Sequence, residues 1–587
     1  MKWPSMPAPS PCRPSSFTAA AAALLIAVVG CGGGPATGPG TGGASGGGAG
    51  NAGTTGGATT GGRGGGAGTG GATAGTSGAA GTGGATAGAS GAAGAGGATA
   101  GGGQGGTAGA AGRGGTPGSG GAAGSGGSAG SGGAGGRGGS TAGASGAQGA
   151  GGAGGRGGSG SGGTGGTGGG SAAPAWDWVG VLGTGQSLAV GGHGNAAAMP
   201  IGSTTQRFRN LKLSLGSASV PPFDPNNAAL SMVPLVETLR AIATGYPSPY
   251  PRNIYGESFH TAMGDEISTL VMAAQSRDYI TAHTAVGEAG QPTSVIQKGA
   301  TDTGSTGRAY AASLFEVAAI ARLAKAQSKS YGVGAIVLTH GESDAASTTF
   351  EADMVRLWQN YNQDLPPLTG QTTSIPMLLS QQHSEPTGAG SSSIGTLAQW
   401  RIGVNRPGDI ICTGPKYQYA YVSDNVHLTN PDYERLGEKY GQVFHQRVVL
   451  GNPWQPLQPT TVERSGRVIT VRFHVPVPPL AWDTTLAMPH QSANTEWAQG
   501  RGFEVRAGTT RIAISGVVIA GDSVQITCAT DPPASGVVVS YAHTADGTPR
   551  PNGTARWGQL RDSDPFVGSL TRVAQPNYCV AFEMNVP

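Results

Sequence analysis

A segment of about 140 residues, 32–174, consists mostly of glycine, alanine, serine and threonine, and its only charged residues are Arg63, Arg113, Arg137 and Arg156. Such a composition cannot bury enough apolar surface to offset the entropy lost on folding. We therefore expect a disordered, flexible tether, roughly 60–70 Å from end to end if it behaves as a Gly-rich coil. The alternative, a structured repeat, is disfavoured because the repetition is one of composition and shows no fixed period.

The residues before the tether have the pattern of an export signal. Lys2 and Arg13 give a positive start, and 17–29 is an apolar run that is too short to span a membrane. The run ends at a small residue followed by Cys31, which resembles a bacterial lipobox, in which the cysteine is lipidated. We expect residues 1–31 to be a lipoprotein signal peptide and the product to be exported and lipid-anchored to the bacterial cell envelope, at the outer membrane or cell surface. Its only membrane contact is then the lipid. The alternative is an ordinary signal peptide with a chance cysteine.

The net charge of +3 hides an uneven distribution. Six of the 34 basic residues precede residue 175 and all 31 acidic residues follow it, so the rest of the chain has a net charge near −3. Binding to nucleic acid needs a clustered basic face. We therefore expect no nucleic-acid partner.

Strand and helix patterns alternate over residues 175–451. Apolar runs typical of buried strands occur at 178–182, 279–286, 335–338, 376–379 and 409–412. Helical patterns lie between and after them, at 265–274, 311–326, 350–361 and 431–449. This alternation favours an α/β fold with a parallel sheet covered on both faces. In such sheets the functional site lies beyond the carboxyl ends of the strands.

Two helix starts carry capping signals. Thr348 with Glu351 three residues later predicts a capping box. Asn430 is the expected N-cap of the last helix, with Pro431 at its first position.

Residues 452–587 have a different character. Short β-rich runs, separated by glycine, proline and aspartate, occur at 468–473, 503–505, 524–526 and 537–541. This pattern predicts an antiparallel β-sandwich, which we take as an accessory domain.

The cysteines are few. Cys12 is removed with the signal, which leaves Cys412, Cys528 and Cys579 beyond the tether. Disulfides are permitted outside the cytoplasm, and Cys528–Cys579 is the plausible pair because both lie in the last region. No pair has metal-ligand spacing, so we expect no metal.

Two short motifs carry candidate chemistry. Residues 183–188 read G-T-G-Q-S-L directly after the first strand, which places Ser187 at a strand-to-helix turn with backbone N–H groups nearby. Asp424 and His427 form a D-x-x-H motif before the last helix, where the aspartate can orient the histidine as a base. Alone, each motif is compatible with an ordinary turn or a surface pair.

Together the motifs resemble those of the SGNH hydrolase superfamily. Their residues are similar to those of its sialate O-acetylesterase and acetylxylan-esterase-like branch. That branch has G-Q-S at the nucleophile, as in 185–187, and Q-G-E-S-D in a later block, where this chain has H-G-E-S-D at 340–344. Residues 287–299 resemble its glycine block. The resemblance implies a three-layer, flavodoxin-like α/β/α hydrolase domain over 175–451.

The resemblance also implies roles for single residues. Ser187 matches the nucleophile, Asp424 and His427 match the acid and base, and the N–H groups of Ser187 and Gly290 match two oxyanion donors. His340 stands where the branch has glutamine, and we expect that it replaces this third donor.

Three further residues are candidate substrate contacts. They are Gln186 beside the nucleophile, His193 in a glycine-rich loop, and His260 in a loop before a helix. For the two histidines, the alternative is an ordinary exposed loop residue.

The sequence therefore predicts a monomeric serine esterase, without cofactor, acting through Ser187, His427 and Asp424. The resemblance implies an acetylated polysaccharide or glycan as its substrate. Two alternatives stay open: a cell-surface carbohydrate-binding or adhesive protein on the same scaffold, and a lipase- or thioesterase-type hydrolase.

Overall fold

The chain is described by a computed structural model that covers residues 176–191, 202–214, 221–239, 256–304 and 306–587. All of these residues belong to one compact unit. The expected signal segment, Cys31, the tether and His193 lie outside the described residues. Among the helices of the described part, none is long and apolar enough to cross a membrane.

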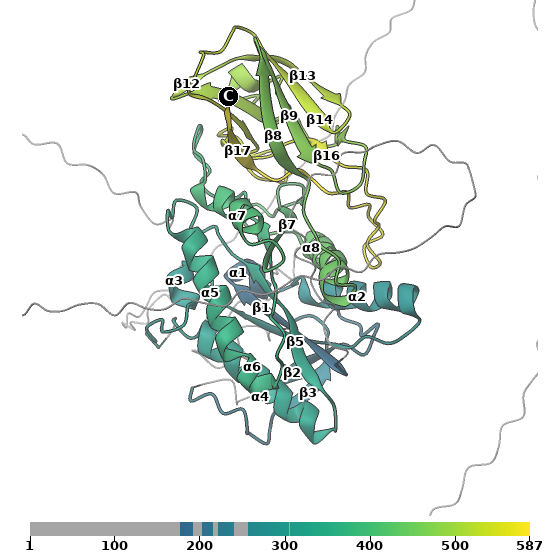
Figure 1. Cartoon of the computed structure of the whole chain (residues 1–587). Helices are drawn as coiled ribbons and strands as arrows, with labels where there is room; N and C mark the ends of the chain where they lie inside the picture. Colours follow the sequence, from purple (N-terminus) through teal and green to yellow (C-terminus); the bar gives the residue numbers. More distant parts are fainter. Residues whose placement is uncertain (1–175, 192–201, 215–220, 240–255, 305) are drawn as a thin grey trace, which may run out of the picture. The chain divides into compact units, whose positions relative to one another are not determined.

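A seven-stranded sheet forms the centre of the α/β part (Figure 1). Its parallel strands are β1 (Trp178–Gly185), β4 (Thr281–Gly287), β5 (Tyr331–Thr339), β6 (Met377–Gln381) and β7 (Ile410–Pro415). They lie in the order β4-β1-β5-β6-β7, which is the flavodoxin-like order of a doubly wound sheet. Two short strands extend the edge, β2 (Leu211–Ser214) parallel to β4 and β3 (Ser231–Pro234) antiparallel to β2. The prediction of an α/β fold with a parallel sheet is confirmed.

Helices cover both faces of this sheet (Figure 1). The long ones are α2 (His260–Gln275), α4 (Ala309–Ala326), α5 (Phe350–Asp364), α7 (Ile394–Asn405) and α8 (Asn430–Phe444), which continues into a π-helical turn, His445–Val449. The short ones are α1 (Ser187–Val190), α3 (Thr293–Ile296) and α6 (Pro366–Thr369). Val179 and Val181 of β1 pack with α2 and α8, whereas Trp178 and Leu182 belong to the cluster of α4, α5 and α7. This alternation follows the period of a strand, and it explains why β1 is buried along its whole length.

The C-terminal β region, residues 458–587, contains two four-stranded antiparallel sheets. One consists of β8 (Gln458–Ser465), β9 (Val468–His474), β13 (Ile514–Ala520) and β14 (Ser523–Cys528). The other consists of β11 (Phe503–Ala507), β12 (Thr510–Arg511), β15 (Val537–Tyr541) and β17 (Phe582–Val586). A small pair, β10 (Ala481–Trp482) and β16 (Leu560–Arg561), and a 3-10 turn, Thr495–Trp497, complete it. Both larger sheets contribute to one hydrophobic cluster: the Phe473 ring lies 6.4 Å from Phe503 and 6.1 Å from Phe582.

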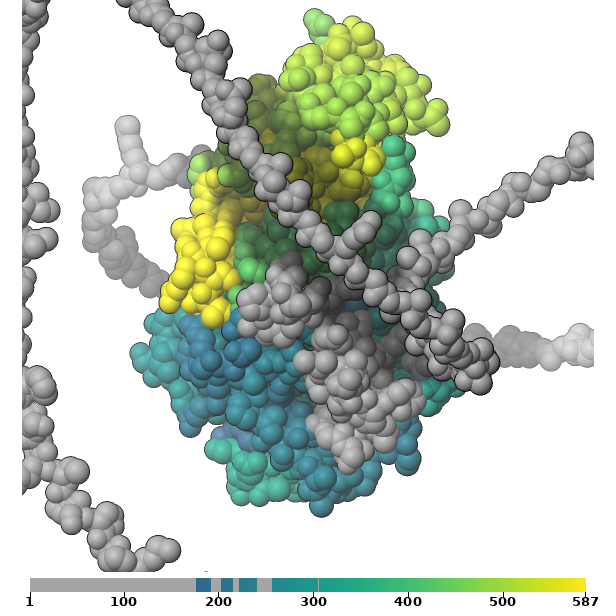
Figure 2. Space-filling view, turned by 180° about the vertical axis from the view of Figure 1, so that it is seen from behind, coloured from purple at the N-terminus to yellow at the C-terminus, as the bar shows by residue number. Residues whose placement is uncertain are grey.

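The β region also contacts the α/β part directly. The N–H of Ser569 donates to the Glu266 carboxylate on α2 (2.8 Å), and the N–H of Leu570 donates to Glu438 on α8 (2.7 Å). Figure 2 shows this late segment, in yellow, against the α/β surface. The described part is therefore held together by polar contacts as well as by its cores.

Three local predictions are wrong. Helix α5 is capped by Thr349 and helix α8 by Thr429, each one residue away from the predicted cap, Thr348 or Asn430. Neither makes a side-chain capping bond to the backbone. Cys528 and Cys579 are unpaired and buried. Cys528 ends β14 in one sheet and Cys579 precedes β17 in the other, so proximity in sequence does not bring the two thiols together.

Candidate active site

Ser187 begins α1 directly after β1, at the carboxyl edge of the parallel sheet. Gly185 makes this sharp turn possible. Its φ of +143° is rare for residues with a side chain, and a Cβ there would lie 2.1 Å from the carbonyl oxygen of Thr339. The turn therefore presents the Ser187 hydroxyl at the edge where the loop after β7 also lies.

The structure brings Ser187, His427 and Asp424 into hydrogen-bond contact. His427 Nε2 lies 2.7 Å from Ser187 Oγ, although the two residues are 240 positions apart. His427 Nδ1 lies 2.7 Å from Asp424 Oδ2. Because an ionised carboxylate only accepts, the ring proton of a neutral His427 sits on Nδ1, and Nε2 accepts from the serine hydroxyl. This arrangement can activate Ser187 as a nucleophile.

Asp424 is held in place by its own loop. Its Oδ1 accepts the N–H groups of Val426 (2.8 Å) and His427 (2.9 Å). Burial raises the pKa of Asp424, but the hydrogen bonds from the His427 side chain and from these two amides lower it to about 2 overall. The carboxylate is therefore ionised and oriented at neutral pH.

The two expected backbone donors of the oxyanion hole, the N–H groups of Ser187 and Gly290, have no other hydrogen-bond partner in the described part of the chain. Gly290 is exposed, with a φ of +64°. Its loop is tied to the nucleophile's strand, because the N–H of Glu288 donates to the Gly185 carbonyl (3.0 Å). The role of both amides as oxyanion donors stays a prediction, which the two unused N–H groups allow.

His340 is not placed as the third donor. It is fully buried, and its Nε2 lies 3.1 Å from the carbonyl oxygen of Gln291. A carbonyl oxygen accepts only, so the N–H at Nε2 is already used. Nδ1 faces the Asp344 carboxylate at 3.4 Å. The geometry therefore does not support replacement of the glutamine donor by His340, which instead fixes the residue that follows Gly290.

Two acidic residues, Glu342 and Asp344, hold residues 340–344 in place. The sequence pattern does not predict which residues they bind. Glu342 forms a buried ion pair with Lys416 (2.8 Å) after β7. Burial raises the pKa of Glu342, but the charge and hydrogen bond of Lys416 hold it below its usual value. Asp344 Oδ2 accepts from the N–H (2.8 Å) and hydroxyl (2.7 Å) of Thr293 at the start of α3. The block is thus tied both to the loop after β7 and to the loop that contains Gly290.

The candidate substrate contacts have different outcomes. Gln186 is buried beside Ser187, and its Oε1 accepts weakly from the Ser343 N–H (3.4 Å). The prediction of His260 as a loop residue that contacts substrate is wrong, because His260 begins α2 and is fully buried. Its Nε2 lies 3.2 Å from the carbonyl oxygen of Ala189. His260 therefore packs against α1, the helix that Ser187 begins.

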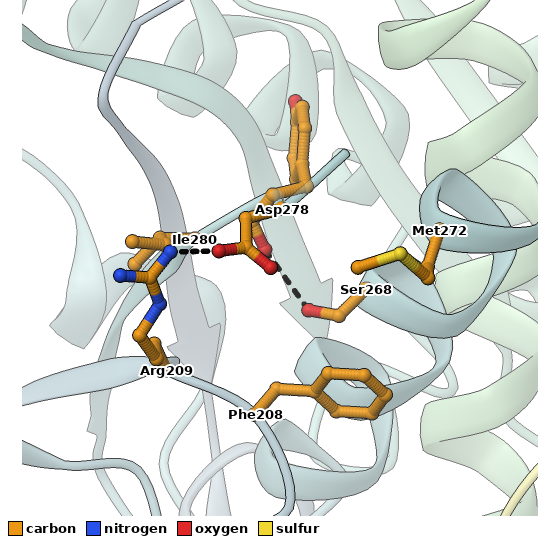
Figure 3. Close-up of a pocket in the computed structure, with 7 residues that line it drawn as sticks. Phe208, Arg209, Ser268, Met272, Asp278 and Ile280 are labelled. Atoms are coloured by element: carbon orange, nitrogen blue, oxygen red, sulfur yellow. Dashed lines mark hydrogen bonds and ion pairs between the residues drawn. The ribbon is translucent and has the colours of Figure 1, made fainter. Parts of the chain in front are cut away.

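A small pocket (Figure 3) lies near the amino end of β4. It is lined by Phe208, Arg209, Ser268, Met272, Asp278, Tyr279 and Ile280. Residues 278–280 precede β4 at its amino end, whereas Ser187 follows the carboxyl end of β1. The pocket is therefore separate from the candidate site. Within the described ranges, no group of three His, Cys, Asp or Glu residues is arranged to hold a metal ion.

Comparisons with known proteins give only distant similarities. No protein-family profile matches the chain, and no curated protein sequence matches it. Among solved structures, a carbohydrate acetylesterase from Xanthomonas citri is similar with a TM-score of 0.43 and 13% identity, over 69% of this chain and 80% of that one. An Arabidopsis thaliana protein is similar with a TM-score of 0.32 and 15% identity, over 46% of this chain and 98% of that one. Est24, a carbohydrate acetylesterase from Sinorhizobium meliloti, has a TM-score of 0.22 and 12% identity, over 45% and 97% of the two chains. Similarities at this level do not establish a shared activity.

Proposed function

We propose that the protein is a serine esterase that removes acetyl or other short acyl groups from carbohydrates. One observation carries this proposal: His427 Nε2 lies 2.7 Å from Ser187 Oγ, and Nδ1 of the same ring lies 2.7 Å from Asp424. A serine, a base and an orienting carboxylate in contact are the parts that acyl transfer needs.

The chemistry follows from these contacts. His427 Nε2 takes the proton of Ser187 as Oγ bonds to the ester carbonyl carbon. The carbonyl oxygen becomes an oxyanion, which the N–H groups of Ser187 and Gly290 stabilise. When this intermediate collapses, the bond to the sugar oxygen breaks and His427 returns the proton to that oxygen. Water, deprotonated by His427, then attacks the acyl-enzyme, which releases the carboxylic acid and restores Ser187.

The carbohydrate part of the proposal rests on the resemblance of the G-Q-S, glycine and H-G-E-S-D blocks to sialate O-acetylesterase-like enzymes. Two alternatives make different predictions. A lipase or thioesterase prefers long acyl chains or thioesters. A carbohydrate-binding protein that has lost turnover binds glycans and hydrolyses nothing.

A panel of esters distinguishes these functions. The full chain is tested on aryl acetate, aryl palmitate, an acyl thioester and an acetylated polysaccharide, with Ser187→Ala beside it. We expect acetate release from the first and last substrates, and a loss of about 10⁴–10⁶-fold in Ser187→Ala. Ser374→Ala is the matched control, because Ser374 is an exposed serine that bonds Asn362 (3.2 Å), remote in sequence from the site. Hydrolysis that survives in Ser187→Ala would contradict the proposal.

We also propose that the protein is exported and anchored through a lipid on Cys31. The support is the sequence pattern of residues 1–31. Metabolic labelling with a radioactive fatty acid tests it: the wild-type chain should take up label, and Cys31→Ser should not. Equal labelling of both chains would contradict the anchor.

A further inference from the structure

The loop that carries His427 is folded back on itself. In this His427 loop, residues 416–429 between β7 and α8, Tyr421 and Leu428 form an antiparallel bridge. The N–H of Val422 donates to the carbonyl oxygen of His427 (2.9 Å). The backbone position of His427 is therefore set by the segment around Tyr421.

An arginine from the C-terminal β region forms hydrogen bonds with that segment. Arg550 Nη2 donates to the carbonyl oxygens of Tyr417 (2.6 Å) and Tyr419 (2.5 Å), and its Nε also donates to Tyr417 (3.1 Å). The two acceptors are alternate residues of the His427 loop. The guanidinium places two donor nitrogens, Nε and Nη2, against the His427 loop, whereas a lysine would offer one.

The turn that carries Arg550 makes a second contact. The Tyr421 N–H, which points away from Leu428, donates to the carbonyl oxygen of Asn552 (2.9 Å). The turn itself packs on the arginine, because a Cβ on Gly553 would lie 2.4 Å from the Arg550 side chain. Side-chain and backbone contacts thus fix the loop from the same turn, residues 550–554, the support turn.

The burial of Arg550 indicates that these contacts are specific. Its relative exposure is 9%, and in the described part of the chain its side-chain hydrogen bonds all go to backbone carbonyl oxygens. Burial lowers the pKa of Arg550. A buried charge is costly unless its donors are satisfied. Here carbonyl oxygens of the His427 loop accept from Nε and Nη2, and the carbonyl oxygen of Pro551 accepts from Nη1 (3.4 Å).

We propose that Arg550 is a positioning residue for His427, and that the C-terminal β region is thereby a structural part of the esterase site. The inference rests on the proposed function only for its effect on catalysis. The support turn acts through the backbone of the His427 loop, at residues 417, 419 and 421.

The expected effect is on turnover. A displacement of about 1 Å at a reacting group can lower the rate about 10²-fold. We therefore expect Arg550→Ala in the full chain to lower kcat about 10²-fold, with KM changed less than about threefold. Arg550→Lys, which keeps the charge but has one donor nitrogen on a shorter side chain, should fall between Arg550→Ala and wild type.

The test needs a readout that does not depend on activity. The Nδ1 proton of a histidine bonded to a carboxylate gives a low-field proton NMR signal, which is assigned to His427 by its absence in His427→Ala. We expect this signal in the wild type and its loss or broadening in Arg550→Ala. Arg501→Ala is the matched control, since Arg501 lies in the same β region and bonds Gln559 (2.8 Å) instead of the His427 loop. It should keep both the signal and kcat.

The outcomes separate the two proposals. A wild-type chain that shows the signal but hydrolyses no ester contradicts the proposed function, and the signal in Arg550→Ala still decides the positioning role. A folded Arg550→Ala protein with the wild-type signal, and with kcat within about twofold of an active wild type, overturns the inference. If Arg550→Ala does not fold, Gly553→Ala is used, because it keeps the arginine and displaces its side chain. Loss of the signal supports the inference and an unchanged signal overturns it.

Discussion

The replacement of Asp424 by asparagine tests how the site fixes the histidine tautomer. Asp424 Oδ1 accepts two backbone N–H groups, at 2.8 and 2.9 Å, while Oδ2 accepts from His427 Nδ1. An asparagine has one accepting oxygen. If that oxygen faces the two amides, its NH2 group faces Nδ1, which must then accept. The ring proton moves to Nε2, and His427 can no longer take the proton of Ser187.

The magnitude follows from the alternative orientation. Turning the asparagine oxygen toward His427 leaves two amide donors facing an NH2 group, at a cost of about 1–3 kcal/mol each. A penalty of about 2–6 kcal/mol lowers the population of the productive tautomer by about 30-fold to 10⁴-fold. Loss of the negative charge opposite the imidazolium adds to this. We expect kcat/KM of Asp424→Asn to fall by about 10³–10⁴-fold, as for the equivalent change in trypsin-like triads.

The assay is hydrolysis of an aryl acetate by the full chain at neutral pH. Asp224→Asn is the matched control, because exposed Asp224 also accepts a backbone N–H two residues later, from Asn226 (2.8 Å). It should keep full activity. If Asp424→Asn retains more than about a tenth of kcat/KM while Ser187→Ala is inactive, the tautomer reasoning is refuted.

Three further predictions concern residues around the site and in the β region. His340→Gln should keep most of kcat, because its amide can still donate to the Gln291 carbonyl, whereas His340→Ala should lower kcat about tenfold or more by releasing the Gly290 loop; equal activity of the two variants in steady-state assays would contradict this. Glu342→Gln should lower the free energy of unfolding by about 3–5 kcal/mol in urea titrations, because it leaves Lys416 buried and unpaired; a loss below about 1 kcal/mol would speak against the pair. Burial raises the pKa of Glu504, but contacts with buried histidines lower it from 4.5 to about 2, so its stabilisation is present above pH 4.5 and is lost as the pH falls towards 2. Glu504→Gln should therefore flatten the acid side of the stability profile, and an unchanged profile would exclude this role.

Much of the α/β part could be predicted because its pattern is local. The five apolar runs each fall largely within β1, β4, β5, β6 or β7. Short strands such as β2 and β3 were not predicted, since they lie at the sheet edge and carry no long apolar run. Helix α7 was also not predicted. Seven of its residues are buried, among them polar Thr396 and Gln399, so it shows no amphipathic stripe.

The candidate site was predictable only where its chemistry lies in short motifs. Ser187, Asp424 and His427 each stand in such a motif, and folding brings them together. The partner of Glu342 and the support turn could not be predicted, because Lys416 and Arg550 act across 74 and 133 positions, respectively, from the residues they bind. The sequence predicts His340 as an oxyanion donor and His260 as a substrate contact, because it shows where a histidine stands but not where its ring points.

Covalent trapping tests whether Ser187 is the nucleophile. The full chain is treated with diethyl 4-nitrophenyl phosphate, and its peptides are then mapped by mass spectrometry. We expect one diethylphosphoryl group per chain, on the peptide that contains Ser187, formed in step with the loss of esterase activity and absent from Ser187→Ala. Full inhibition with the label on another residue, or labelling of Ser187→Ala at the wild-type rate, would contradict it.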